Sequence, residues 1–398
     1  MLSTLSRRSR GTFLWILPWI LLVGTACVDE PLPEKESEIV FGWISPGVED
    51  HSTVTGATLA SRDLAAQGGI LLGDRRIAVR LEVAESVNSP EIAAARAFEM
   101  INRKGAVAIL GLASTATALP VARIAETHQV PMVSILSSHP DTTTERDFAF
   151  RLTLTDRTQG QVLAQAAVDH LGARRAGMLI DVSNPHCVSI GGAFQEAFEA
   201  LGGEIGVRVD YTEDQPDLDA TFEPFFDDRV DFLFLPNVSP RNAPALTRAR
   251  QRGLGLPVLG GDSWSAMTVD ERAMTTDLFY LDLWAPELEP AARRFADEVS
   301  ERHGLRANAS MVLGYDAVSL VAEAIRLTGR TDPESIRDSL ATIEDYRGLA
   351  GPYRFRGTDG TPHRQVYLRH LVAGEESLLA TLATEGSGPP RPVEARAP

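Results

Sequence analysis

The sequence predicts an α/β protein with two doubly wound parallel-sheet lobes joined by a multi-strand hinge. The first observation behind this fold class is an alternation of short apolar segments with segments of helical periodicity, typical of β-α-β units in a parallel sheet. The second is that the same plan starts again near Arg151 and so occurs twice. The third is a group of long helical segments after the second copy, which indicates that the chain returns to the first lobe.

The first copy alternates strand and helical segments after a short N-terminal region. Gly68 and Gly69 follow its first helical segment, and glycine commonly ends a helix. The strands are predicted at residues 39–45, 77–85, 106–111 and 130–135, and the helices at 56–66, 90–102 and 116–127.

The second copy repeats this order and is followed by the returning helices. Its helices are predicted at about 159–171, 191–201, 222–226 and 244–252, and its strands at 176–181, 205–211, 231–236, 257–262 and 278–284. The later helices are predicted at 290–303, 311–328 and 333–342, and the closing strands at 353–355 and 365–372.

These segments define two lobes, each made from two pieces of the chain. We assign residues 39–153 and 286–347 to lobe 1, and residues 154–285 and 348–375 to lobe 2. Open α/β sheets bind ligands beyond the carboxyl ends of their strands, so two lobes facing each other would enclose one cleft. Residues 376–398 are expected to form a disordered C-terminal tail.

The N-terminus has the features of an export signal. Residues 1–26 combine three arginines with the apolar run Phe13–Val23, which is shorter than the ~20 residues of a membrane-spanning helix. The sequence Gly-Thr-Ala before Cys27 resembles a bacterial lipobox, which predicts a lipid on Cys27; ordinary cleavage after Ala26 also fits. Residues 27–38 are acidic and contain prolines, as expected of a tether. The protein is therefore expected at the extracytoplasmic face, attached to the membrane by lipid.

Composition excludes several function classes. The chain has 38 Lys and Arg against 54 Asp and Glu, a net charge of -16, so nucleic acid is not an expected partner. Two cysteines exclude a disulfide scaffold and a four-cysteine zinc site. No GxSxG, HExxH, P-loop or GxGxxG motif occurs in a suitable context. We expect no catalytic residue, cofactor or metal, and no enzyme activity.

Several segments together resemble one family. They include LASRDLAAQGGILLGDRRIAVRLEVAES, GLASTATALPVARIAETHQVPMVS, LGGDSWS, LGYDAVSLVAEAI and YRGLAGPYRF, and the similarity extends from about Ile39 to Val372. The chain resembles the type 1 periplasmic binding proteins of the Leu/Ile/Val-binding group, which capture solutes for ABC importers. The resemblance implies a monomeric clamshell, an amino acid or related small molecule as ligand, and an ABC permease as membrane partner.

The resemblance also implies a site for a zwitterion. The ligand carboxylate would be held on lobe 1 by Ser114, Thr115, the backbone of Leu136, and Ser138. Such loop ends and helix N-termini favour anions, although Ser114 could instead be a helix N-cap. The ammonium group would bind Asp262, which directly follows a lobe-2 strand; the alternative is a turn-forming aspartate.

Departures from the family pattern affect the ligand. His186 stands where many relatives have an aromatic residue over the ligand, and the loop after the first strand is short. Further candidates for the cleft are Trp43, Val238, Arg241, Asp282 and Trp284. His186 and Arg241 could donate hydrogen bonds to an acidic or polar ligand; the alternatives are a solvated position for both and a core position for Trp43.

The expected function is therefore capture of an amino acid or similar polar solute between two lobes and its delivery to an ABC importer. The alternative is a ligand-sensing lipoprotein of the same fold that acts in signalling or envelope regulation.

Overall fold

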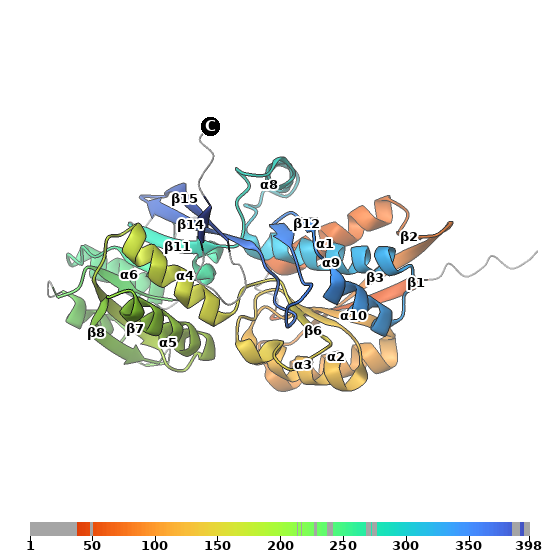
Figure 1. The fold of residues 1–398 in the computed structure, drawn as a ribbon, viewed down its shortest axis with the longest axis horizontal. Coiled ribbons are helices and arrows are strands. Elements are labelled where there is room, and N and C mark those ends of the chain that lie inside the picture. Colours follow the sequence, from red (N-terminus) through yellow and green to blue (C-terminus); the bar gives the residue numbers. More distant parts are fainter. Residues whose placement is uncertain are drawn as a thin grey trace, which may run out of the picture. The chain divides into compact units, whose positions relative to one another are not determined.

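The computed structural model describes residues 38–47, 51–212, 214–215, 217–226, 229–236, 242–267, 272, 277–383 and 391–393. The proposed signal peptide, Cys27 and nearly all of the proposed tether lie outside the described residues, as do Val238 and Arg241. Within the described part, the predicted fold class is confirmed: helices and strands alternate, and the strands form two main sheets that are rich in parallel pairs (Figure 1).

Lobe 1 is built on a six-stranded sheet with the order β2-β3-β1-β4-β5-β6. The central strand β1 pairs in parallel with β3 and β4, and its residues are buried after the first. Only β2 runs antiparallel, in a hairpin with β3. The strands are β1 (Glu38–Ser45), β2 (Ile70–Leu72), β3 (Arg75–Glu85), β4 (Ala106–Gly111), β5 (Met132–Ser134) and β6 (Ala149–Arg151).

Helices from both ends of the chain cover this sheet. The late helix α9 (Ala309–Thr328) packs on α1 (His51–Ala66), although the two have very different colours in Figure 1. The chain thus packs a late helix against an early one. The other helices are α2 (Pro90–Lys104), α3 (Thr115–His128), α8 (Pro290–His303) and α10 (Pro333–Thr342), with a 3-10 turn η1 at Pro140–Thr142.

Lobe 2 is built on an eight-stranded sheet with the order β16-β15-β14-β11-β10-β9-β7-β8. Its strands are β7 (Arg175–Asp181), β8 (Glu204–Tyr211), β9 (Phe232–Phe234), β10 (Val258–Gly260), β11 (Leu278–Asp282), β14 (Gln365–Val372), β15 (Glu375–Ala383) and β16 (Arg391–Val393). Its helices are α4 (Asp156–Asp169), α5 (Pro185–Ala200) and α6 (Asn242–Gln251), with 3-10 helices η2 (Asp219–Phe225) and η3 (Asp262–Ala266).

The expectation of a disordered tail from residue 376 is wrong for residues 376–383 and 391–393. Residues 375–383 form β15, which pairs antiparallel with β14 along its whole length. Ala373 and Gly374 connect the two strands and both have positive φ, as two-residue hairpin turns require. Alanine is an uncommon residue at such a φ, so the turn has no clear sequence signal.

Three segments connect the lobes: residues 152–155, 283–289 and 343–364, the last carrying the small hairpin β12 (Tyr346–Gly348) and β13 (Gly351–Tyr353). Arg364 joins all three. Its buried guanidinium donates to the carbonyls of Leu152, of Leu283 at 2.6 Å and of Ala350 at 3.3 Å. One side chain therefore contacts all three connecting segments of the hinge.

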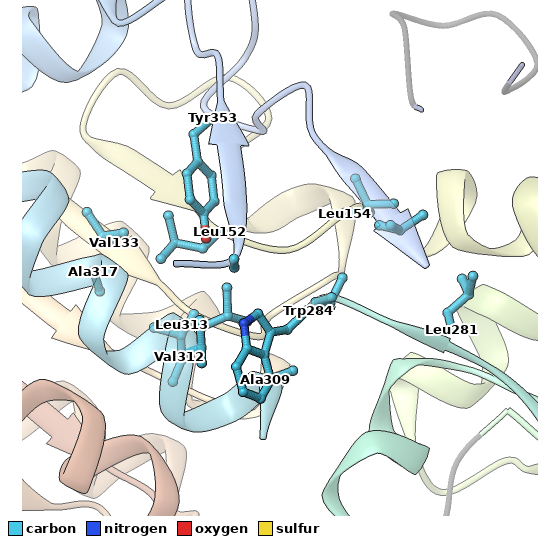
Figure 2. Packing of buried hydrophobic residues seen from close by; sticks show 14 of the residues in the cluster. Val133, Leu152, Leu154, Leu281, Trp284, Ala309, Val312, Leu313, Ala317 and Tyr353 are labelled. Carbon is cyan, nitrogen blue, oxygen red and sulfur yellow. The ribbon is translucent and has the colours of Figure 1, made fainter. Parts of the chain in front are cut away.

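One continuous apolar cluster contains residues of both lobes and of the hinge. It includes Val133 from β5, Leu281 from β11 and Leu313 from α9 (Figure 2). Trp284, in the second connecting segment, belongs to the same cluster and is 4% exposed. Burial of this surface stabilises both lobes and the hinge.

The crossing of α1 and α9 depends on two glycines. A Cβ on Gly56 would lie 1.8 Å from the Met311 carbonyl oxygen, and one on Gly314 would lie 2.3 Å from that of Thr53. We expect Gly56→Ala to destabilise the protein by about 1–3 kcal/mol, because the backbones must separate. Chemical denaturation measures this. Gly192→Ala, on α5 with open space around it, is the matched control and should be neutral or slightly stabilising. An equal effect of both changes would contradict the prediction.

Candidate ligand-binding site

The lobe-1 part of the site consists of two loops at the carboxyl ends of β4 and β5. Ser114 is the N-cap of α3, and its Oγ accepts from the Thr117 N–H at 3.4 Å, so the capping interpretation is confirmed. Thr115 begins the helix and accepts from the Ser137 hydroxyl at 3.3 Å. Leu136 is partly buried and Ser138 is 3% exposed. Both loops therefore meet at the N-terminus of α3, where the helix dipole favours an anion.

A buried arginine supports the second of these loops. Arg151 is fully buried and donates to the carbonyls of Ser137 and Pro140, each at 3.0 Å, and to the Thr143 hydroxyl at 2.8 Å. Burial lowers the pKa of Arg151 to about 10, which leaves it charged at neutral pH. The loop that carries Ser138 thus rests on a positive charge. Sequence reasoning missed this residue.

The lobe-2 part of the site centres on Asp262, which starts η3 directly after β10. Its Oδ2 accepts from the Thr153 hydroxyl at 3.2 Å and from the Gln159 amide at 3.0 Å. Burial raises the pKa of Asp262, and His186 together with these two bonds opposes this only in part. Among the described residues, no lysine or arginine forms an ion pair with this carboxylate.

Two glycines fix the position of Asp262. A Cβ on Gly260 would lie 2.1 Å from the ring of Trp264, and one on Gly261 would lie 2.7 Å from the Pro236 carbonyl oxygen. Trp264 is fully buried and donates from Nε1 to the Leu235 carbonyl at 2.9 Å. The Gly-Gly-Asp sequence is therefore required for close packing behind the carboxylate.

His186 brings the two lobes together at this site. Its Nδ1 lies 3.0 Å from the Ser138 hydroxyl of lobe 1 and 2.7 Å from Oδ1 of Asp156 at the start of α4. Burial opposes the charge on Asp156, but the hydrogen bond and charge of His186 outweigh it and lower the pKa of Asp156. The structure thus unites the predicted residues Ser138 and His186.

Three atoms in this group have unused hydrogen-bonding capacity. Within the part of the chain that the structure describes, the buried atoms Nε2 of His186, Oδ2 of Asp156 and Oε1 of Gln159 make no hydrogen bond. Buried polar atoms without a partner cost about 1–3 kcal/mol each. A polar ligand that satisfies them would gain this free energy on binding.

The remaining candidates lie elsewhere. Trp43 is fully buried in the apolar cluster, which supports its core interpretation. Asp282 accepts from Arg369 Nε at 2.7 Å and from the Trp284 N–H at 3.2 Å, so its charge is already paired. A cavity of about 540 Å³ has Ser265, Asp282 and Trp284 in its described lining, but not Asp262 or His186. The structure therefore does not bring these three candidates together with Asp262 and His186.

Asp156, Gln159 and Thr153 were also missed as site residues. Asp156 and Gln159 are one turn apart at the N-terminus of α4, and Thr153 lies just before it in the first connecting segment. Their position could have indicated them, because they are polar residues at the point where the chain enters the second lobe. Among the described residues, no group of three or more His, Cys, Asp or Glu could hold a metal ion.

Comparison with known proteins gives consistent matches. The family model described as periplasmic binding protein matches residues 47–376. A leucine binding protein from Thermotoga maritima has a similar structure, with a TM-score of 0.77 and 25% identity, covering 87% of this chain and 98% of that one. A solute binding protein of an ABC transporter from R. palustris, in complex with 4-hydroxybenzoate, has a TM-score of 0.75 and 19% identity, covering 87% and 97%. An amino acid binding protein from Pseudomonas aeruginosa is 22% identical over 318 residues, which are 75% of this chain and 80% of that protein.

Proposed function

The chain belongs to the periplasmic binding protein family, and on that premise we propose that it holds an amino acid between its two lobes and delivers it to an ABC importer. A leucine binding protein has a similar structure, and an amino acid binding protein is similar in sequence. It is a binding protein and not an enzyme, since the family model that it matches is that of a periplasmic binding protein and a relative of similar structure is a leucine binding protein.

The observation that carries the amino-acid ligand is the environment of Asp262. Asp262 is half-buried, accepts hydrogen bonds from the neutral side chains of Thr153 and Gln159, and forms no ion pair with a lysine or arginine among the described residues. The charge of His186 offsets only part of the effect of burial, so the pKa of Asp262 stays raised. A buried charge of this kind is stabilised by a bound charge of opposite sign. An ammonium group supplies that charge and three hydrogen-bond donors. The free Oε1 of Gln159 is a second acceptor for it.

The ligand carboxylate is assigned to lobe 1. Ser114 and Thr115 start α3, where N–H groups and the helix dipole favour an anion. The loop with the Leu136 backbone and Ser138 reaches this N-terminus through the hydrogen bond from Ser137 to Thr115. The charge of Arg151 lies behind this loop and acts in the same direction. An amino acid would thus be bound at its negative end by lobe 1 and at its positive end by lobe 2.

Ligand binding would favour closure of the lobes by population shift. A molecule that contacts both lobes binds the closed form more tightly than the open form, so it shifts the equilibrium toward closure. The Ser138–His186 contact joins the same two surfaces and would have to break when the lobes separate. The membrane permease would then recognise the closed outline, and no covalent bond is made or broken.

We further infer an extracytoplasmic location with a lipid on Cys27. The position of Cys27 after an apolar segment and Gly-Thr-Ala supports it. Within the described residues, every helix falls short of the length and apolar character that a bilayer crossing requires. Labelling of cells with a palmitate analogue should mark the wild-type protein and not Cys27→Ser. Equal labelling of both would remove the lipid assignment.

A thermal-shift screen tests the proposed function. The mature protein would be measured with L-leucine, L-isoleucine, L-glutamate, L-asparagine and 4-hydroxybenzoate. At a hundred times its dissociation constant, a true ligand stabilises the folded state by about 2.7 kcal/mol. We expect at least one of the amino acids to do so. Stabilisation by 4-hydroxybenzoate alone, or by none of the five, would contradict the proposal.

A further inference from the structure

His186 contacts polar side chains of both lobes. Its Nδ1 is engaged by two groups, Asp156 Oδ1 at 2.7 Å and the Ser138 hydroxyl at 3.0 Å. Asp156 is on α4 and His186 on α5, both in lobe 2, whereas Ser138 belongs to lobe 1. The ring therefore lies directly beside the loop to which the ligand carboxylate is assigned.

The partners of Nδ1 determine what the other ring nitrogen offers. An ionised carboxylate can only accept a hydrogen bond, so Nδ1 carries the hydrogen that points to Asp156. Burial alone would lower the pKa of His186, but the hydrogen bond and charge of Asp156, with a contribution from Asp262, outweigh it and raise that pKa above its ordinary value of 6.5. In the charged ring Nε2 also carries a hydrogen. This atom is buried and makes no hydrogen bond within the described residues.

We propose that His186 is a specificity-determining residue that donates from Nε2 to a carboxylate oxygen of the ligand, so that this anionic group is bound from both lobes. The inference rests on the proposed function and goes beyond it, because lobe 2 contributes to binding the negative end of the ligand as well as the positive end. Asp156 is a positioning residue: it holds the ring and keeps it charged.

The charges around His186 make this interaction depend on pH. Within the described part of the chain, the charged groups that face the ring are Asp156 on α4 and Asp262 at the start of η3. The donor is present below the raised pKa of His186 and is lost as the pH rises through it. Ionisation of Asp262 acts in the opposite sense, because the ammonium group binds more tightly as the pH rises through the raised pKa of that carboxyl. An experiment must therefore separate the two residues.

Titration calorimetry of matched variants makes that separation. Dissociation constants for L-leucine, L-isoleucine and L-glutamate would be measured between about pH 6 and pH 8.5 for wild type and His186→Gln, because unperturbed histidine titrates near 6.5. The ratio of the two constants cancels the titration of the ligand. It keeps the change that loss of the His186 charge makes to the titration of Asp262, which is why Asp156→Asn is measured as well. We expect His186→Gln to weaken binding by about tenfold at the acid end, the size of a charged hydrogen bond. This difference should shrink by up to a decade per pH unit as the imidazolium is lost.

Two further variants distinguish this role from a structural one. Asp156→Asn removes the charge that favours the imidazolium. The tighter binding that the charged ring gives should therefore be lost at a lower pH than in wild type, while the protein still folds. His170→Gln, at the exposed far end of α4, is the control and should leave both affinity and pH profile unchanged. Circular dichroism of each variant checks the fold.

The outcomes separate the inference from the proposed function. Amino-acid binding with a wild-type to His186→Gln ratio that does not change with pH would overturn the role of His186 alone. An Asp156→Asn profile identical to wild type would also overturn it. If none of the three amino acids binds at any pH, the proposed function fails and this inference fails with it.

Discussion

Replacing Asp262 with asparagine is expected to weaken amino-acid binding by at least about a hundredfold. The change keeps the size of the side chain and an oxygen that Thr153 and Gln159 can still contact. It removes the only charge assigned to the ligand ammonium, and an ammonium left without a partner in a closed site costs roughly 3–5 kcal/mol. That cost corresponds to a factor of a hundred or more in dissociation constant. Titration calorimetry with the tightest-binding amino acid measures the effect directly.

The specificity of this effect can be checked with one control variant and one control ligand. Asp169→Asn, at the exposed C-terminal end of α4, removes a carboxylate of the same lobe and should leave affinity unchanged. If 4-hydroxybenzoate binds at all, its affinity should not fall in Asp262→Asn, because it has no ammonium group. An unchanged dissociation constant for amino acids in Asp262→Asn would remove the ammonium assignment.

Replacing Arg364 with methionine should lower the free energy of unfolding by about 3–5 kcal/mol. Methionine retains much of the apolar length but leaves the buried carbonyls of Leu152, Leu283 and Ala350 without their donor, at about 1–3 kcal/mol each. The guanidinium also lies over the ring of Tyr353, with its carbon 5.0 Å from the centroid, and this contact is lost too. Urea unfolding followed by circular dichroism and tryptophan fluorescence measures the change.

Because Arg364 contacts all three connecting segments, its loss should also reduce coupling between the lobes. We expect the two optical signals to coincide in wild type and to separate in Arg364→Met, as happens when unfolding is no longer two-state. Arg354→Met, an exposed neighbour in the third segment, is the matched control. If the control loses as much stability as Arg364→Met, the hydrogen bonds of Arg364 to the three segments do not cause the loss.

Much of the fold could be predicted from periodicity alone. Alternating apolar strands and amphipathic helices indicated two α/β lobes, and the late helices indicated the return to lobe 1 that α9 makes. What periodicity missed are features whose signal is not local. The turn at Ala373-Gly374 lacks the Asn-Gly pattern typical of tight hairpins, so the sequence predicts a tail where the structure has β15.

The candidate site was predictable only in part, because some of its residues have no local signal in the sequence. Residues directly after strands, such as Ser114, Ser138 and Asp262, can be found from the rule that ligands bind at carboxyl ends of strands. Asp156 and Arg364 follow no strand, and their partners lie on other elements far along the chain. Only the folded structure shows that Asp156 bonds His186, or that Asp282 is already paired with Arg369. A single sequence contains no information on such pairings.

The close contact of α1 with α9 has a consequence for how this molecule can be divided. Gly56 and Gly314 touch the partner helix from opposite ends of the chain, so the N-terminal sheet lacks part of its cover until the later residues are present. β14 likewise completes the other sheet from beyond the returning helices. No single cut therefore yields one intact lobe, and a fragment meant to fold alone must join two separated stretches of sequence with a new linker.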